Sequence, residues 1–287
     1  ITFAASLGLE TTPGRITLGE GQLTINSSVT LTGPGADLLT VDGNQLSRVF
    51  SVNSDATATI RGLTITGGNA GTYGDGGGVA NYGTLMMAHV AVSENTADYG
   101  GGVYNSSGTL SVVSATFSGN VGDDYGGGIY NSGGTVSILN STLTGNTAVN
   151  SSSSYGGGVY NSYGTLTVSN CTLASNTAKT SGGGIHVSSG SLTVTNSILW
   201  QNGGGELGGS GSVTGSWNLI AIDPGFVRNP SDGGDGWRDN PSTIAVDESA
   251  NNDYGDLHLT DHSLAVGYGD NGSLPLDTQD LDEDGVT

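Results

Sequence analysis

The chain contains few of the residues on which several protein classes depend. Its 287 residues include one cysteine and six prolines. A single thiol, Cys171, cannot form an intramolecular disulfide, so a disulfide-stapled domain is excluded. So few prolines, without glycine at every third position, exclude collagen. Packing and backbone pairing must therefore stabilise the fold.

Basic residues and long apolar runs are scarce as well. The 26 Asp and Glu outnumber the 6 Lys and Arg, which gives a formal charge of −20. Such a surface repels nucleic acids and anionic membranes. No apolar run approaches the roughly 20 residues of a membrane span, and no charged-then-apolar signal segment opens the chain. We therefore expect no nucleic-acid partner and no insertion into a membrane.

Small, turn-forming residues are abundant instead. Gly, Ser, Thr and Asn together make up 143 of the 287 residues, and 52 of them are Gly. Each Gly inside a helix would cost roughly 1 kcal/mol, which argues against an all-α domain. The hydrophobic residues, 34% of the chain, form short alternating runs, which argues against disorder. The composition predicts many short strands and tight turns.

Three features recur in a fixed order along the middle of the chain. A glycine triplet followed by an aliphatic residue begins at Gly76, Gly100, Gly126, Gly156 and Gly182. An aliphatic residue nine or ten positions later stands at Leu85, Leu110, Val136, Leu166 and Leu192. Ten positions after each of these is an asparagine, at Asn95, Asn120, Asn146, Asn176 and Asn202. Only the stretch from the asparagine to the next triplet varies in length, so insertions are confined to one corner of the repeat.

Within the constant ten residues, apolar positions alternate. Leu166, Val168, Cys171 and Leu173 are expected to point inward, and a further strand follows each glycine triplet. Each coil of about 25 residues then has three short strands and three corners, and it must stack on copies of itself to bury its apolar face. The predicted fold is all-β, a right-handed single-stranded parallel β-helix. The right-handed winding follows from the strong preference of crossover connections between parallel strands for a right-handed path.

We expect two regions. Residues 1–202 form the coils, with regular repeats over 76–202, and residues 203–287 form acidic, irregular C-terminal coils and a tail that closes the helix. The net charge is −6 before residue 203 and −14 from Gly203 onward.

The repeat units GGGVYNSSGTLSVVSATFSGN and GGGVYNSYGTLTVSNCTLASN are similar to those of bacterial extracellular proteins in the pectate-lyase-like β-helix superfamily. More closely, they resemble surface and secreted β-helix proteins with a downstream anchoring domain. The acidic stretch 256–285 is similar to the tail that ends such helices. The resemblance implies the right-handed β-helix and an extracellular or cell-surface location. It leaves the activity open, because the superfamily includes lyases, hydrolases, adhesins and inert scaffolds.

Residues for catalysis are few. A polysaccharide lyase of this fold needs a base beside a uronate, and a hydrolase needs paired carboxylates. The basic residues are scattered over different coils. Asp123 and Asp124 form an acidic pair in the variable corner, where no His or Arg occupies a matching register. We therefore assign no catalytic residue, and a carbohydrate-active enzyme remains the alternative.

Tyrosines occupy one register beside the glycine triplets. Tyr104, Tyr130 and Tyr160 are expected to point outward and stack one coil apart, because the neighbouring aliphatic residues point inward. His186 takes the same register in the next coil, and Tyr99, Tyr125 and Tyr155 stand at the nearby corner. Such a stripe is typical of a self-stabilising ladder, and it can also bind sugar rings. The asparagine series predicts a second kind of ladder, built from stacked amides at a turn.

An acidic segment near the C-terminus resembles half of a calcium loop. Asp280, Asp282 and Asp284 alternate and are followed by Gly285, as in a loop whose carboxylates converge on one Ca²⁺. These three residues are the candidate metal site, with Ca²⁺ as the candidate cofactor, and a merely acidic loop or linker is the alternative.

Together these observations predict a non-catalytic scaffold that acts by shape and surface. We expect an extracellular or cell-surface structural or adhesive protein. Its partners are either copies of itself, associated end to end or laterally, or an extracellular polysaccharide. A glycan-binding module that uses Tyr104, Tyr130 and Tyr160 is a further alternative.

Overall fold

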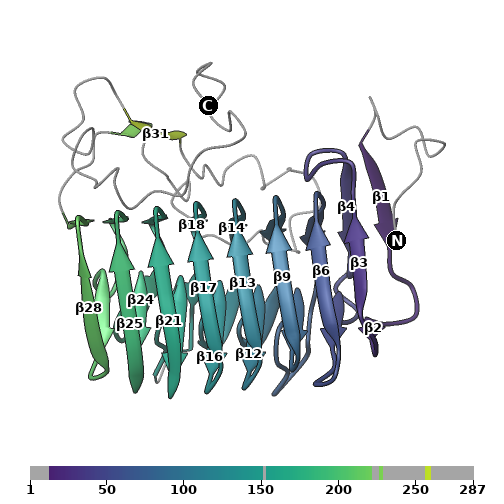
Figure 1. The fold of residues 1–287 in the computed structure, drawn as a ribbon, viewed down its shortest axis with the longest axis horizontal. Coiled ribbons are helices and arrows are strands. Elements are labelled where there is room, and N and C mark those ends of the chain that lie inside the picture. Colours follow the sequence, from purple (N-terminus) through teal and green to yellow (C-terminus); the bar gives the residue numbers. More distant parts are fainter. Residues whose placement is uncertain (1–12, 151–152, 222–225, 229–255, 260–287) are drawn as a thin grey trace.

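A computed structural model describes residues 13–150, 153–221, 226–228 and 256–259. Successive coils stack along one axis as a parallel β-solenoid (Figure 1). All elements of the described residues are strands and connecting turns, and the named strands of sheets I to IV pair in parallel between coils. The predicted parallel β-helix is thereby confirmed.

Sheet I runs along the whole solenoid, and sheet II follows it in four of the coils. Sheet I contains β1 (Gly14–Thr17), β4 (Leu39–Asp42), β7 (Thr64–Thr66), β10 (Ala91–Ser93), β14 (Thr116–Ser118), β18 (Thr142–Thr144), β22 (Thr172–Ala174), β26 (Ile198–Trp200) and β29 (Leu219–Ile220). Sheet II contains β11 (Thr96–Tyr99), β15 (Val121–Tyr125), β19 (Thr147–Ala148) and β23 (Thr177–Ala178).

Sheets III and IV complete each coil. Sheet III contains β2 (Leu23–Ile25), β5 (Phe50–Val52), β8 (Val79–Asn81), β12 (Val103–Ser106), β16 (Ile129–Ser132), β20 (Val159–Ser162), β24 (Ile185–Val187) and β27 (Leu207–Gly209). Sheet IV contains β3 (Val29–Thr32), β6 (Thr57–Arg61), β9 (Thr84–Ala88), β13 (Thr109–Val113), β17 (Thr135–Leu139), β21 (Gly164–Ser169), β25 (Gly190–Thr195) and β28 (Ser212–Ser216). A separate antiparallel pair joins β30 (Phe226–Arg228) to β31 (Asp256–Leu259).

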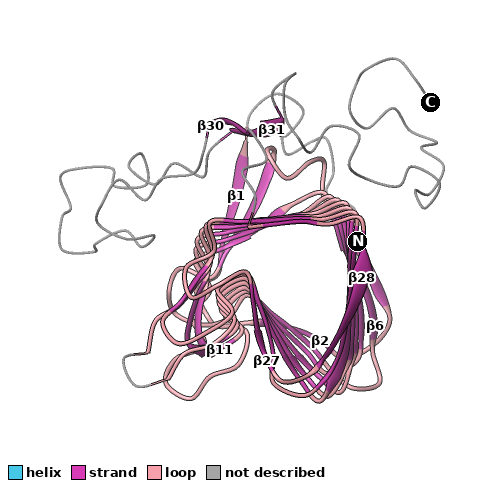
Figure 2. Cartoon of the chain, turned by 90° about the vertical axis from the view of Figure 1, so that its left-hand side faces the viewer, coloured by secondary structure: helices cyan, strands magenta, loops and turns pink. Residues whose placement is uncertain are grey.

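Sheet II adds a fourth strand to the three that the sequence predicts for each coil. Its strands directly follow the corner asparagines and are only two to five residues long. An alternation so short gives no recognisable period, so the sequence pattern does not reveal the strand. Viewed along the axis, the backbone bends inward between the sides that carry β11 and β2 (Figure 2).

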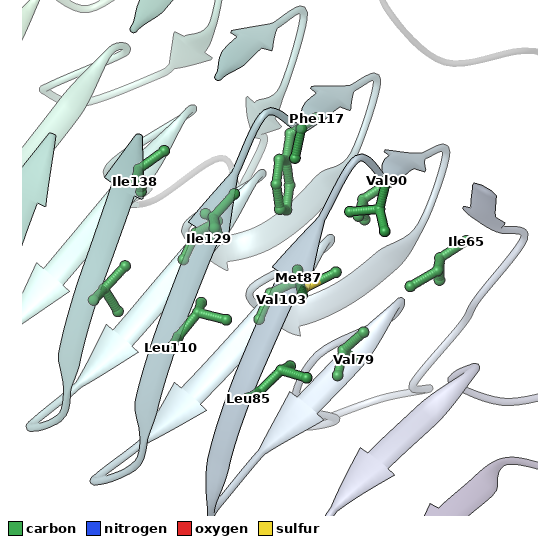
Figure 3. Close-up of a cluster of buried hydrophobic side chains, with 14 of the residues drawn as sticks. Ile65, Val79, Leu85, Met87, Val90, Val103, Leu110, Phe117, Ile129 and Ile138 are labelled. Atoms are coloured by element: carbon green, nitrogen blue, oxygen red, sulfur yellow. The ribbon is translucent and has the colours of Figure 1, made fainter. Parts of the chain in front are cut away.

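The core consists of aligned columns of aliphatic residues. In sheet IV, Leu85, Leu110, Val136, Leu166 and Leu192 pair in register from coil to coil. All five are at most 1% exposed. Side chains of sheets I, III and IV meet inside the coils (Figure 3). Each fully buried aliphatic side chain contributes about 1.5–3 kcal/mol relative to an exposed one, and the stacking of coils makes this burial possible.

Left-handed residues make the corner between sheets IV and I. In successive coils this position is held by His89, Ser114, Asn140, Asn170 and Asn196, all with φ between 49° and 53°. Asn tolerates this conformation because its short side chain hydrogen-bonds locally. Each of these coils needs one such residue, and this need accounts for part of the high Asn and Ser content of the chain.

The division at residue 203 stays a prediction. Within the described residues, β27, β28 and β29 continue sheets III, IV and I by one further coil beyond that position.

Candidate functional site

Two rows of aromatic side chains meet where the backbone bends inward between sheets II and III. Tyr104, Tyr130, Tyr160 and His186 align in register on β12, β16, β20 and β24. Tyr99 and Tyr125 lie on sheet II. Tyr155, one coil further on, pairs with Tyr125 through a parallel bridge. The structure therefore brings together both sets of tyrosines that the sequence predicts to be neighbours.

The rings of the two rows contact one another closely. Within the sheet III row, the ring centroids of Tyr104 and Tyr130 are 5.3 Å apart, and those of Tyr130 and Tyr160 are 5.1 Å apart. Between the rows, the rings of Tyr125 and Tyr160 stack at 4.8 Å. The corner row thus covers the sheet III row. As a result Tyr160 points away from the core as predicted but is only 8% exposed.

Burial raises the pKa of three phenols in these rows, those of Tyr99, Tyr130 and Tyr160. Desolvation raises the pKa of Tyr130 to about 12 and also raises the pKa of Tyr160. The pKa of Tyr99 is raised by desolvation first and then by the charge of Asp124. At neutral pH Tyr99, Tyr130 and Tyr160 are therefore uncharged and supply no phenolate nucleophile.

Tyr130 lies at the centre of this aromatic cluster and provides a test of its structural role. Its ring contacts those of Tyr99, Tyr104, Tyr125 and Tyr160. Since each aromatic pair contributes about 0.5–1.5 kcal/mol, we expect Tyr130→Ala to lower the free energy of unfolding by about 2 kcal/mol. Chemical denaturation of both proteins measures the difference. Tyr163→Ala is the control, because Tyr163 is 79% exposed. An equal effect of the two substitutions would contradict the ladder.

His186 ends the sheet III row and is nearly buried. Its ring stacks on Tyr160 at 5.2 Å with an interplanar angle of 10°, and it lies 4.7 Å from the ring of Tyr155. The side chain is 7% exposed, and its Nδ1 has no hydrogen-bond partner within the described residues. Desolvation lowers the pKa of His186 from 6.5, only partly opposed by a hydrogen bond to the Ser181 backbone. The neutral imidazole is therefore the form that packs in the stack.

The depressed pKa of His186 makes stability sensitive to acid. At a pH between the folded and the unfolded pKa, His186 is protonated in the unfolded chain but neutral in the folded one. The stability that the neutral ring contributes is therefore complete above about pH 6.5, and it declines as the pH falls below that value. His186→Tyr restores the residue found at this register in the three preceding coils and is expected to remove that part of the loss. Thermal unfolding of both proteins from pH 8 to pH 5 measures it. An identical pH profile for the variant would refute this role.

The predicted asparagine ladder is a continuous chain of buried amides. The Nδ2 atoms of Asn95, Asn120, Asn146 and Asn176 each donate to Oδ1 of the asparagine in the next coil, at 2.8–3.0 Å. Each of those oxygens also accepts the backbone N–H of the preceding asparagine. Because the first four asparagines are completely buried, every rung connects two coils without solvent.

A carboxylate ends this ladder. Within the described residues no further asparagine continues the ladder beyond Asn202, whose Nδ2 and backbone N donate to the two carboxylate oxygens of Glu206. Burial raises the pKa of Glu206, while the hydrogen bonds from Asn202 act in the opposite direction. Glu206 therefore supplies the acceptors that the missing next rung would have provided.

A second asparagine ladder was not predicted. Asn81, Asn105 and Asn131 on sheet III donate from Nδ2 to Oδ1 of the next member at 2.7–2.9 Å, and Asn161 is the last acceptor. All four are completely buried. The signal is present in the sequence, because this asparagine ends the motif GGGV(A/Y)N or GGGIYN in each of the four coils.

The remaining candidate residues do not form a reactive cluster. Cys171 is buried as predicted, and desolvation raises its pKa to about 12, so the thiol stays protonated. Asp123 and Asp124 are half-buried, and Asp124 accepts a hydrogen bond from Asn150. Arg15 forms an ion pair with Asp42 of the next coil at 2.8 Å. The part of the chain that the structure describes holds no group of three metal-ligating side chains.

The predicted calcium ligands Asp280, Asp282 and Asp284 lie outside the described residues, as does most of the acidic C-terminal region. Among the residues that are described, no helix is long and apolar enough to cross a membrane.

The stacked coils, inward aliphatic columns and asparagine ladders define a parallel β-solenoid repeat protein. Residues 114–132 match the model of the Chlamydia polymorphic membrane protein repeat. The matched segment includes β14, the ladder residue Asn120, β15, the triplet starting at Gly126, and β16 with Tyr130. No curated protein and no solved structure matches the chain.

Proposed function

We propose that the protein is a surface-exposed scaffold of the adhesive type that works without catalytic turnover. The observation that carries this proposal is the match of residues 114–132 to a repeat of polymorphic membrane proteins, in a chain that stacks copies of that unit. A solenoid offers an extended surface, and its function then resides in what that surface contacts. An extracellular or cell-surface location is part of the proposal.

The chemistry of the aromatic cluster supports a structural role for it. The inward bend between sheets II and III is occupied by mutually packed rings. Their hydrophobic and quadrupolar contacts hold neighbouring coils together. A polysaccharide lyase would instead require a base positioned at an accessible groove.

An adhesion assay combined with an activity assay tests the proposal. The complete chain is coated on beads, and bead retention on cell monolayers is measured against an uncharged polymer coating. In parallel, the protein is incubated with pectin, alginate and glycosaminoglycans, with and without Ca²⁺. Retention without release of unsaturated or reducing ends is expected. Release of such ends, or absence of retention, would overturn the proposal.

End-to-end association is a finer part of the same proposal. In the described residues β28 is the last strand of sheet IV, and all five of its residues are exposed. Val213 pairs in register with the completely buried Leu192 but is itself 45% exposed. An open apolar column and a free strand edge favour the addition of another coil. Negative-stain images at high concentration should show filaments, and isolated rods alone would contradict the idea.

Calcium binding by Asp280, Asp282 and Asp284 remains a proposal based on their alternation. Isothermal titration of the complete chain with CaCl₂ tests it, and Asp282→Asn should weaken the binding that is observed. If titration of the unsubstituted protein with CaCl₂ gives no heat of binding, the proposed calcium site is wrong.

A further inference from the structure

A polar pocket lies at the N-terminal end of the aromatic rows. Its volume is about 300 Å³, and Gln22, Gln45, Leu46, Arg48 and Asn69 are among the residues that line it. These residues come from three successive coils. Gln22 precedes β2, the next three lie between β4 and β5, and Asn69 lies between β7 and β8. The pocket is thus built at one corner of the solenoid.

The pocket lies where small residues replace the tyrosines at their register on sheet III. Toward the N-terminus, Tyr104 pairs with Ala80, Ala80 with Ser51, and Ser51 with Thr24. The ladder of large rings therefore stops at Tyr104 on sheet III. In the coils of β2, β5 and β8 this register therefore holds no ring, although Tyr82, just after β8, lies edge-on to Tyr104 with ring centroids 6.3 Å apart.

Arg48 occupies a register that is glycine in the following coils. Because Phe50 pairs with Val79, Arg48 lies opposite Gly77. At Gly77 a Cβ would meet Thr96 O at 2.4 Å and Gly101 O at 2.7 Å, so no side chain fits there. The coil of β5 has no sheet II strand beside it, and this is why the position accepts an arginine that lines a pocket.

The polar groups of the pocket are held in place but keep free hydrogen-bonding capacity. Asn44 and Gln45 both have left-handed backbones, with φ of 54° and 57°, and Gln45 N donates to Gly67 O at 2.7 Å. Asn69 Oδ1 accepts from Gly71 N. Within the described residues the Arg48 guanidinium has no hydrogen bond or ion pair, although its charge acts on Asp75. The left-handed backbone at these two adjacent residues is part of the turn between β4 and β5.

We propose that this pocket binds a neutral sugar residue of a glycan, which would make it the contact site of the adhesive function proposed above. Sugar hydroxyls both donate and accept, and the three amides and the guanidinium offer matching groups. Leu46, 64% exposed, provides an apolar surface for the C–H face of the ring. A volume of about 300 Å³ is at the small end of ligand sites and suits one ring. Asp75, on which the Arg48 charge acts, and the net charge of −6 over residues 1–202 disfavour an acidic sugar.

Saturation-transfer NMR with the complete chain tests the site. The probes are the methyl glycosides of glucose, galactose, mannose and N-acetylglucosamine, with galacturonic acid as the charged comparison. At least one neutral glycoside should receive saturation from the protein. Arg48→Ala and Gln45→Gly should each weaken its affinity at least about tenfold, since each removes hydrogen bonds to the ligand.

Gln45→Gly separates loss of binding from loss of folding. Glycine adopts a positive φ without strain, so this variant should unfold no more easily than the original protein. Gln201→Gly is the matched control, because Gln201 is also exposed, has φ of 52° and lies at the other end of the solenoid. Its sugar binding should be unchanged.

Three results would overturn the pocket: no neutral glycoside binds, binding survives both pocket substitutions, or galacturonic acid binds better than every neutral probe. If Arg48→Ala loses sugar binding but coated beads are still retained on cells, the adhesive function stands and the pocket is not its contact site. If beads coated with the unsubstituted protein are not retained on cells, the proposed adhesive function is wrong whatever the NMR result.

Discussion

Asn146→Ala is expected to lower the free energy of unfolding by about 4 kcal/mol, because it leaves several buried groups without partners. Nδ2 of Asn146 donates to Phe117 O, Thr144 O and Asn176 Oδ1, at 2.9, 3.2 and 2.8 Å. Its Oδ1 accepts from both the backbone N and Nδ2 of Asn120. The substitution removes all five hydrogen bonds at a site with no access to water.

The measurement is urea unfolding of the variant beside the unsubstituted protein and Thr165→Ala. Thr165 is exposed on the outer side of β21, so its loss should change stability by less than about 0.5 kcal/mol. In a solenoid each coil contacts only its neighbours, so the defect should first open the coils on either side of Asn146. Hydrogen exchange should therefore accelerate near β14, β18 and β22. Equal stability of Asn146→Ala and Thr165→Ala would refute the ladder as a stabilising element.

Gly127→Ala should destabilise the protein by about 3 kcal/mol, because the added methyl group has no space. A Cβ at this position would lie 2.4 Å from Thr147 O, 2.5 Å from Thr147 N and 2.6 Å from Gly157 O. All three are backbone atoms, so relief requires displacement of the chain. The glycine triplet is thus needed for close approach between backbones of adjacent coils.

Gly19→Ala is the control for this substitution. A Cβ on Gly19 would meet no atom within 4 Å, and its φ is not in the left-handed region. Alanine there should be neutral or should raise stability by about 0.4–1 kcal/mol, since it restricts the unfolded chain. Differential scanning calorimetry of both variants gives the comparison. A melting temperature of Gly127→Ala equal to that of Gly19→Ala would contradict steric exclusion.

The spacing of sequence features predicted most of the fold. A constant ten-residue interval from the aliphatic residue to Asn places each Asn in register with the next, and the structure has the resulting amide chain from Asn95 to Asn202. The inward direction of Leu110, Cys171 and Leu192 followed from alternation in the same way. Periodicity is sufficient here because each coil repeats the environment of its neighbour.

Other features depend on contacts between different sides of a coil, and the spacing of the repeat says nothing about how closely those sides approach. Sheet II is too short to show a period, and the covering of Tyr160 by Tyr125 depends on how far the backbone bends inward at the glycine triplet. The pocket at Arg48 arises where the ring ladder and sheet II are both missing, which requires the register of three coils at once.

By itself the sequence determined the solenoid, the identity of its inward columns and one amide ladder, because these depend on a repeat that aligns equivalent residues. Only the tertiary structure decided which outward residues are covered. It joined the two tyrosine rows into one cluster, ended the asparagine ladder at Glu206 and left a polar pocket beside Arg48. Those outcomes depend on how two sides of one coil approach each other, and this approach is set by corner geometry and by the absence of side chains at the glycine triplets.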